Sequence, residues 1–254
     1  SPKRMVELTC LAKTQIALID KNARLVSPAP LGDYGVKWLS DFLREGGGGC
    51  IDIVGYHFYN KHRPPETHID IARSVRLEMA KYGVSKLPIW NTESGWLISD
   101  AVQTIDAAQA GFRTGDFQLA EKESASYLIR EFVLHWVAGI DRSFFYAWDN
   151  GVMGLINKNG SLKPGALAID QLIGLMKGRT IPFCSTDNIV WQCELKLSSG
   201  VVGHLLWSVK GDIDFSIPDG WSANDYLVFG ESGYRVMANR RVLRIGGTPV
   251  YLRN

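Results

Sequence analysis

Residues 87–96 read Leu-Pro-Ile-Trp-Asn-Thr-Glu-Ser-Gly-Trp, and this stretch decides the fold class. Leu87 to Thr92 is a short apolar run of the kind expected for a strand buried in a parallel sheet. Glu93 follows it directly and is flanked by Trp90 and Trp96. Because α/β folds place ligands and catalytic groups at the carboxyl ends of parallel strands, the stretch predicts both a fold class and a site.

Helical and strand patterns alternate on both sides of this stretch. Upstream, the pattern predicts a helix from Met5 to Ile19, a strand over Arg24–Ser27, a helix over Val36–Arg44, a strand over Ile51–Tyr59 and a helix over Ile69–Tyr82. Downstream, it predicts a helix over Lys122–Val137, a strand over Ser143–Trp148 and a helix over Pro164–Met176. Four strands that alternate with helices imply a parallel sheet joined by right-handed crossovers.

The chain changes character near Thr180. Beyond it we find no helical pattern, and short apolar runs are split by turn residues such as Ser198-Ser199-Gly200. The predicted strands are Ile189–Leu197, Val201–Trp207, Tyr226–Phe229, Arg235–Met237, Val242–Ile245 and Val250–Leu252. We therefore expect an α/β domain over residues 1–179 and a small antiparallel β-sandwich over residues 180–254.

Composition excludes several classes of protein. The 254 residues include 28 basic and 26 acidic side chains, for a net charge of +2, and 46% are hydrophobic, which is typical of a folded globular chain and not of a disordered one. The basic residues are scattered, so no nucleic-acid partner is expected. No apolar run approaches the roughly 18 to 20 residues of a membrane span. The first residues lack the pattern of a signal peptide, which leaves export and localisation open.

The cysteines and histidines give no metal-binding pattern. Cys10, Cys50, Cys184 and Cys193 contain no CxxC spacing, and the histidines outside the strand ends have no ligand spacing, so we expect no metal and no cofactor. Two arrangements of the cysteines remain open. One is a disulfide between Cys184 and Cys193 across a hairpin, and the other is four buried thiols.

Two further strand ends add polar and aromatic groups at the same edge of the predicted sheet. One strand ends with His57-Phe58-Tyr59, and another ends with Trp148. Aromatic rings stack on the apolar face of a sugar, Tyr and His donate hydrogen bonds, and a carboxylate attacks or stabilises an anomeric carbon. This set of groups indicates carbohydrate chemistry, with an oligo- or polysaccharide as the partner.

At these residues the sequence resembles the clan A retaining glycoside hydrolases, and the terminal sheet resembles the accessory domain of the β-xylosidase and α-iduronidase-like branch. The resemblance implies a (β/α)8 TIM barrel in which residues 87–96 form strand seven and Glu93 is the nucleophile. It also implies that Tyr59 hydrogen-bonds the nucleophile, that His57 and Trp96 contact substrate, and that Trp148 forms the floor of the sugar subsite.

One departure from the family pattern sets the expected extent of the chain. Clan A enzymes carry the acid/base Glu after an Asn at the end of strand four, and this sequence has no Asn-Glu pair. Because residues 87–96 are taken as strand seven, the predicted strand before it, Ile51–Tyr59, is strand six, and Arg24–Ser27 is strand five. The sequence is therefore interpreted as strands five to eight plus an accessory domain, with the acid/base upstream, and the chain alone is expected to be nearly inactive.

Structural alternatives stand beside each functional assignment. Glu93 could be a solvated loop residue, Trp148 a core residue, Trp96 a packing residue, and His57 a structural histidine. The long connection over residues 97–121 is expected to form a wall of the cleft, with Phe112, Arg113 and Phe117 as outer contacts. For the whole protein, the rivals are a noncatalytic carbohydrate-binding protein and a nucleotide-binding α/β domain, and no phosphate-binding motif supports the latter.

Overall fold

The computed structural model describes residues 1–60, 63–99, 117–237 and 241–253, and the predicted contacts Phe112 and Arg113 lie outside these residues. The chain forms two compact units. The first contains Ser1–Trp96 and Ala138–Tyr146, and the second contains Leu97–Val137 and Ala147–Asn254. Each unit has a hydrophobic core of its own.

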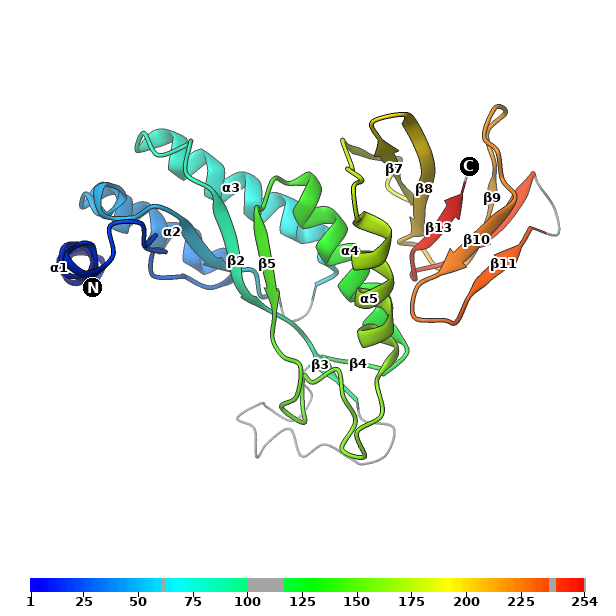
Figure 1. Cartoon of the computed structure of the whole chain (residues 1–254), viewed down its shortest axis with the longest axis horizontal. Helices are drawn as coiled ribbons and strands as arrows, with labels where there is room; N and C mark the ends of the chain where they lie inside the picture. Colours follow the sequence, from blue (N-terminus) through cyan, green and yellow to red (C-terminus); the bar gives the residue numbers. More distant parts are fainter. Residues whose placement is uncertain (61–62, 100–116, 238–240, 254) are drawn as a thin grey trace. The chain divides into compact units, whose positions relative to one another are not determined.

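The first unit is a parallel sheet with helices, as the alternating pattern predicts. Its helices are α1 (Pro2–Ile19), α2 (Gly32–Arg44) and α3 (His68–Lys81), with short 3-10 turns at Gly47–Cys50 and Pro65–Thr67. Its strands are β1 (Val54–His57), β2 (Ile89–Ser94) and β5 (Arg142–Phe145). They are parallel in the order β1-β2-β5, and β2 and β5 lie side by side in Figure 1.

The core of this unit lies between the helices and the sheet. Helix α2 buries Leu39, Phe42 and Leu43, and helix α3 buries residues that include Val75 and Met79. Buried residues three and four positions apart share one face of a helix, which is why the sequence pattern could be recognised as helical. These two faces pack in one cluster with the apolar residues of β1 and β2, and the helices lie next to each other in Figure 1.

One predicted strand of the sheet is corrected, and another strand is unusually exposed. The predicted strand Arg24–Ser27 is reduced to an isolated parallel bridge between Val26 and Ile53, although this bridge still places it beside the β1 segment. Strand β5 departs from the burial that is usual for strands of a parallel sheet, because Phe144 is 48% exposed. Among the residues that the structure describes, β5 pairs with β2 alone in the three-stranded sheet, so it is an edge strand with one side left open.

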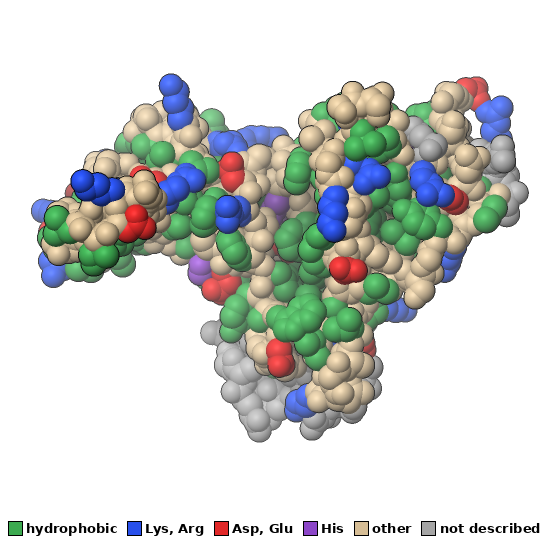
Figure 2. Space-filling view, in the orientation of Figure 1, with side chains coloured by type: hydrophobic (Ala, Val, Ile, Leu, Met, Phe, Trp, Pro, Cys, Tyr) green, Lys and Arg blue, Asp and Glu red, His purple; other side chains and the backbone are tan. Residues whose placement is uncertain are grey.

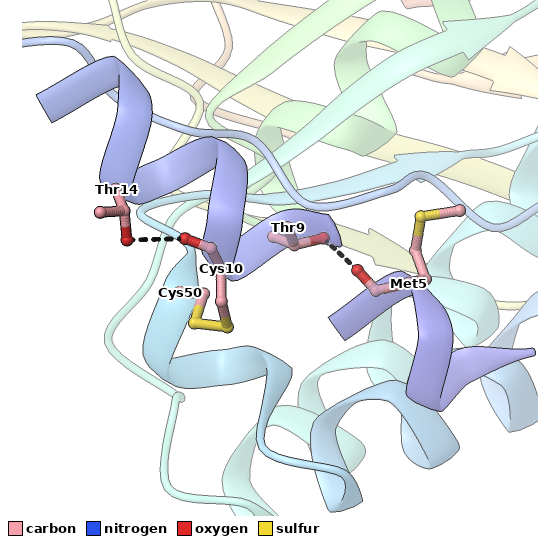
Figure 3. Close-up of a disulfide and its surroundings, with 5 residues drawn as sticks. All are labelled: Met5, Thr9, Cys10, Thr14 and Cys50. Carbon is pink, nitrogen blue, oxygen red and sulfur yellow. Dashed lines mark hydrogen bonds between the residues drawn. A yellow bond between two sulfur atoms is a disulfide. The ribbon is translucent and has the colours of Figure 1, made fainter. Parts of the chain in front are cut away.

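Helix α1 is fastened to the first unit by a disulfide that the spacing of the cysteines did not predict. Cys10 on α1 is bonded to Cys50 in the 3-10 turn, across a sequence separation of 40 (Figure 3). Along the same helix, Thr9 donates a hydrogen bond to the carbonyl of Met5, and Thr14 donates one to the carbonyl of Cys10 (Figure 3). The helix has a single buried residue, Thr9, so covalent attachment supplements a small apolar contact.

The second unit combines two helices with antiparallel sheets. Its helices are α4 (Glu123–Val137) and α5 (Pro164–Met176), and a short parallel pair joins β3 (Leu97–Ile98) to β4 (Gln118–Leu119). The remaining strands are β6 (Cys184–Thr186), β7 (Val190–Leu197), β8 (Gly200–Ser208), β9 (Ile213–Ser216), β10 (Asp225–Val228), β11 (Tyr234–Val236), β12 (Val242–Ile245) and β13 (Val250–Arg253).

The C-terminal strands form a six-stranded sheet in the order β11-β10-β13-β8-β7-β6 and a two-stranded sheet of β12 and β9. One core contains Leu206 and Leu252 from the larger sheet and Leu243 and Ile245 from the smaller one. The antiparallel architecture after Thr180 is therefore confirmed. Strands β6 and β9 were not predicted, because they are short and carry polar residues.

The second disulfide joins Cys184 to Cys193, which are direct partners in the pairing of β6 with β7. Of the two arrangements left open by the sequence, the hairpin disulfide is confirmed, and the alternative of four buried thiols is wrong. All four cysteines are bonded, since Cys10 and Cys50 form the other pair.

Among the described residues, no helix combines the length and the apolar character needed to cross a bilayer. Lys and Arg side chains are distributed over the face shown in Figure 2, among acidic, hydrophobic and other residues.

Candidate active site

Glu93 lies on strand β2, and an irregularity in the sheet sets its position. Strands β1 and β2 pair in regular register from Val54 with Ile89 to Tyr56 with Asn91, after which His57 pairs with Glu93. The register skips Thr92, which is the signature of a β-bulge. A bulge changes which side chains face each other, and here it brings Glu93 opposite His57.

Buried hydrogen bonds hold the bulge. Asn91 is fully buried, and its side-chain nitrogen donates to the hydroxyl of Ser94 at 2.6 Å. The backbone on either side is also held, because Phe58 N donates to the carbonyl of Glu93 at 3.1 Å and Tyr146 N donates to the carbonyl of Ser94 at 2.7 Å. Glu93 therefore projects from backbone that is fixed by both neighbouring segments.

The Glu93 carboxylate meets two side chains from the end of β1. The Tyr59 hydroxyl donates a hydrogen bond to Glu93 Oε1 at 2.6 Å. His57 Nε2 lies 3.9 Å from Glu93 Oε2, which is beyond hydrogen-bond distance but close enough for attraction if the imidazole is protonated. His57 and Tyr59 are two residues apart along an extended segment, so their side chains emerge on the same face.

This geometry leaves one carboxylate oxygen held and the other accessible. The Glu93 side chain is 36% exposed, so an incoming group can reach it. A carboxylate can act as a nucleophile through an oxygen that an incoming group can reach. The arrangement is therefore chemically suited to attack by Oε2 while Oε1 is kept in place.

The two tryptophans that flank Glu93 have different surroundings. Trp90 is partly buried on β2, with the Arg142 guanidinium 4.8 Å from its ring centre. Trp96 is only 3% exposed and stacks on His68, with ring centres 5.9 Å apart. Of the two roles considered for Trp96, this burial favours packing and does not support a sugar contact.

Trp148 lies in the second unit and is 56% exposed. Its carbonyl accepts a hydrogen bond from Leu155 N, and the next turn is capped by Asn150, whose side-chain oxygen accepts from Val152 N and Met153 N. Trp148 is therefore not a core residue, and Asn150 has a structural role. Phe117, an expected outer contact, is 37% exposed and packs near Tyr127 in the same unit.

Sequence reasoning missed the residues that position the site. Asn91 and Ser94 hold the bulge, yet in the sequence they are ordinary polar residues next to the conspicuous Glu93. The two residues are three positions apart within residues 87–96, and this close spacing was the available sequence signal for a contact between them. Nothing in the sequence indicated that the register would shift there, because a bulge is a property of the pairing and not of one strand.

Residues 10–125 match the family model described as the glycosyl hydrolase catalytic core. The matched region includes His57, Tyr59, Glu93 and Trp96, and it ends before Trp148. Comparison with curated protein sequences gives no significant match.

Solved structures share the fold at low sequence identity. A family 39 glycoside hydrolase from Bacteroides cellulosilyticus has 17% identity and a TM-score of 0.75, over 98% of this chain and 54% of that one. An α-L-arabinofuranosidase from Thermotoga maritima has 12% identity and a TM-score of 0.64, over 100% and 62%. A glucosidase from Croceicoccus marinus has 16% identity and a TM-score of 0.56, over 96% and 50%. The chain therefore spans less than two thirds of each of these proteins.

Proposed function

We propose that this chain carries the nucleophile side of the active site of a retaining glycoside hydrolase, with Glu93 as the nucleophile. The observation that carries the proposal is the 2.6 Å hydrogen bond from Tyr59 to Glu93 Oε1 at the carboxyl edge of a parallel sheet. The match of residues 10–125 to the glycosyl hydrolase catalytic core supports it. The substrate class is a β-linked oligo- or polysaccharide.

In the first step, Glu93 Oε2 attacks the anomeric carbon and forms a glycosyl ester. The bond from that carbon to the leaving oxygen breaks, and the leaving oxygen keeps the electron pair and takes a proton from a general acid. Tyr59 holds Oε1 throughout and keeps the carboxylate oriented. In the second step, water gives a proton to the same acid/base residue and attacks the anomeric carbon, which releases Glu93 as a carboxylate.

The acid/base residue is assigned to a part of the protein outside these 254 residues. In retaining enzymes the two carboxyl groups are about 5 to 5.5 Å apart, so the missing group would lie at about that distance from the Glu93 carboxylate. Residues 1–179 would then supply strands five to eight of the barrel, and residues 180–254 an accessory β-sandwich domain. Without the acid, the chain alone would barely hydrolyse ordinary glycosides.

The other site residues receive roles that follow from their surroundings. His57 is placed to contact a sugar hydroxyl or to steady Glu93 Oε2, since its Nε2 lies 3.9 Å from that oxygen. Trp148 is 56% exposed, and its role as a sugar platform stays a prediction from the sequence. The two disulfides are typical of an oxidising compartment, and we assign the protein to a secreted or periplasmic location.

Covalent trapping tests the nucleophile. Activated 2-deoxy-2-fluoroglycosyl fluorides release fluoride without protonation, so we expect them to form a stable ester on Glu93. Peptide mapping by mass spectrometry locates the adduct. Glu93→Gln should abolish it, whereas Glu45→Gln, at the end of α2, should leave it intact. A label elsewhere, or no label on Glu93 in a protein that also contains the acid/base residue, overturns the proposal.

A noncatalytic carbohydrate-binding protein on the same scaffold is the second candidate, and the absence of an Asn-Glu pair from the sequence favours it. In that case the side chains around Glu93 would bind a glycan, and Glu93 would only accept a hydrogen bond from it. Glu93→Gln separates the two functions, because glycan binding would survive in both cases while turnover by the longer protein would be lost only for an enzyme.

A further inference from the structure

Residues 156–162 form a tight turn within the second unit. Ile156 and Leu162 close it with an isolated antiparallel bridge. Inside the bridge, Asn157 N donates to the carbonyl of Ser161 at 2.9 Å, and Gly160 N donates to the carbonyl of Asn157 at 2.8 Å. Gly160 has a φ of 84°, a left-handed conformation that glycine adopts without strain. Backbone hydrogen bonds and one glycine therefore define the turn.

The turn contains the triplet Asn159-Gly160-Ser161. It fits the pattern Asn-x-Ser/Thr, with x other than Pro, which is the acceptor pattern for an N-linked glycan. No other asparagine of the sequence has Ser or Thr two positions later. Such a triplet also occurs by chance in many chains, so its surroundings in the fold decide whether a glycan fits there.

The whole triplet lies at the surface. Asn159, Gly160 and Ser161 are exposed, and the next residue, Leu162, is 57% exposed. The neighbouring Asn157 is only 5% exposed, so the turn presents one of its two asparagines and encloses the other. A glycan is bulky and hydrophilic and needs a surface position. Asn159 provides such a position.

The side chains of the triplet contact each other through the oxygen of the amide. Ser161 N donates to Asn159 Oδ1 at 3.0 Å, which makes an Asx turn, and Ser161 Oγ donates to the same oxygen at 2.7 Å. The hydroxyl that the acceptor pattern requires is therefore in contact with the amide. No described residue accepts a hydrogen bond from the amide nitrogen, Nδ2. Because the two residues are two positions apart, this contact forms locally.

The disulfides give an independent indication of the compartment. All four cysteines are bonded, in the pairs Cys10–Cys50 and Cys184–Cys193. Disulfides form in oxidising surroundings such as the lumen of the endoplasmic reticulum. Chains that enter that lumen also meet the machinery that adds N-linked glycans.

We propose that Asn159 is an N-glycosylation site, whose co-reactant is an oligosaccharide carried on a lipid diphosphate. A bond forms between Asn159 Nδ2 and the anomeric carbon of the first sugar, and the bond from that carbon to the diphosphate oxygen breaks. The diphosphate leaves with the electron pair, and Nδ2 gives up one proton to a base of the transferase. The inference rests on the secreted location assigned above and is independent of the role of Glu93.

Peptide mapping of the chain made in cultured eukaryotic cells tests the site. The full chain is directed into the secretory pathway by a signal peptide, and both cell extract and medium are analysed, so that unfolded chains are counted as well. Peptide N-glycosidase in heavy-oxygen water converts a glycosylated asparagine into a heavy-oxygen aspartate, and a digest without enzyme measures spontaneous deamidation of the Asn-Gly pair. Most molecules should carry the enzyme-dependent label at Asn159. An Asn159 without this label overturns the inference.

Substitutions within the triplet check which atoms are needed. Asn159→Gln and Ser161→Ala should each abolish the gel shift that peptide N-glycosidase causes, whereas Ser161→Thr keeps the hydroxyl and should retain it. Asn22→Gln is the matched control, because Asn22 is also exposed in a turn but is followed by Ala23 and Arg24. It should leave the shift unchanged. A shift that persists in Asn159→Gln or Ser161→Ala overturns the assignment.

One further variant tests whether the folded turn selects Asn159. Asn159→Ser moves the acceptor pattern to Asn157, whose side-chain nitrogen donates to Glu121 Oε1 and to Ser161 Oγ, each at 3.1 Å. A glycan on this buried nitrogen would break both hydrogen bonds. No glycan-bearing form of Asn159→Ser should therefore reach the medium, whereas the glycosylated parent chain should. A secreted variant with a glycan on Asn157 overturns the claim that surface position decides the site.

Discussion

The two disulfides should differ in their contribution to stability. Cys10–Cys50 closes a separation of 40 residues, and Cys184–Cys193 closes one of 9. In the chain-entropy model, loss of the longer loop costs about 3.9 kcal/mol and loss of the shorter one about 2.6 kcal/mol. The double variants Cys10→Ser/Cys50→Ser and Cys184→Ser/Cys193→Ser should therefore lose free energy of unfolding in that order.

The structure enlarges this difference. Strands β6 and β7 keep their backbone pairing when the shorter disulfide is removed, because the two cysteines are ordinary partners in the ladder. Thr9 is the one buried residue of helix α1, and Leu18 and Ile19 are exposed, so few contacts replace the longer disulfide. The ion pair of Lys13 with Asp52 remains, but partly exposed pairs contribute little.

Urea unfolding gives the free energies, and amide hydrogen exchange read by mass spectrometry gives the location. In Cys10→Ser/Cys50→Ser, amides of α1 should lose protection. In Cys184→Ser/Cys193→Ser, only the β6–β7 hairpin should exchange faster. An equal loss of stability in the hairpin variant, or full protection of α1 without its disulfide, would refute the predicted order.

Two other predictions concern the bulge and a buried histidine. Ser94→Ala removes the hydrogen-bond partner of the fully buried Asn91 amide, so it should lower the free energy of unfolding in urea by about 1 to 3 kcal/mol. It should also slow the labelling of Glu93 by the fluorosugar. The control Ser74→Ala, at an exposed hydroxyl on α3, should change the free energy of unfolding by less than about 0.5 kcal/mol. Equal costs would contradict the role given to the bulge. Burial lowers the pKa of His204 to about 4, so the unfolded state takes up protons first as the pH falls below about 6.5, and this residue should contribute a loss of about 2 kcal/mol of stability by pH 5. Buried His68, with a pKa of about 3, should contribute a similar loss. His204→Gln should therefore remove about half of the dependence that the two histidines cause between pH 7 and 5, and an unchanged slope would refute the prediction.

The predictable parts of the fold are those with local signals. Helix α5 begins at Pro164, where a proline at the first helical position marked the start, and it ends at Met176 as predicted. Helix α2 begins at Gly32, four residues before the predicted start, because Leu31 at its N-cap gives no side-chain cap to recognise. Strand β2 runs on to Ser94, so Glu93 lies within the strand and not after it.

The candidate site was predictable in part, for a physical reason. The type of each strand-end residue and its place at the carboxyl edge follow from the alternating pattern, and these indicated Glu93, His57 and Tyr59 together. Contact between Tyr59 and Glu93, which are 34 positions apart, depends on the register of β1 with β2 and on the bulge within it.

The sequence by itself determined the order of helices and strands, the change to antiparallel strands near Thr180, and the carboxylate that would stand at the end of a central strand. These features depend on periodicity and turn chemistry, which act over a few neighbouring residues. Tertiary structure alone decided which cysteine joins α1 and how the bulge turns Glu93 towards Tyr59. Each of these features depends on the register and packing of segments that are distant in sequence. A pattern within a few neighbouring residues does not specify which distant segments will come into contact.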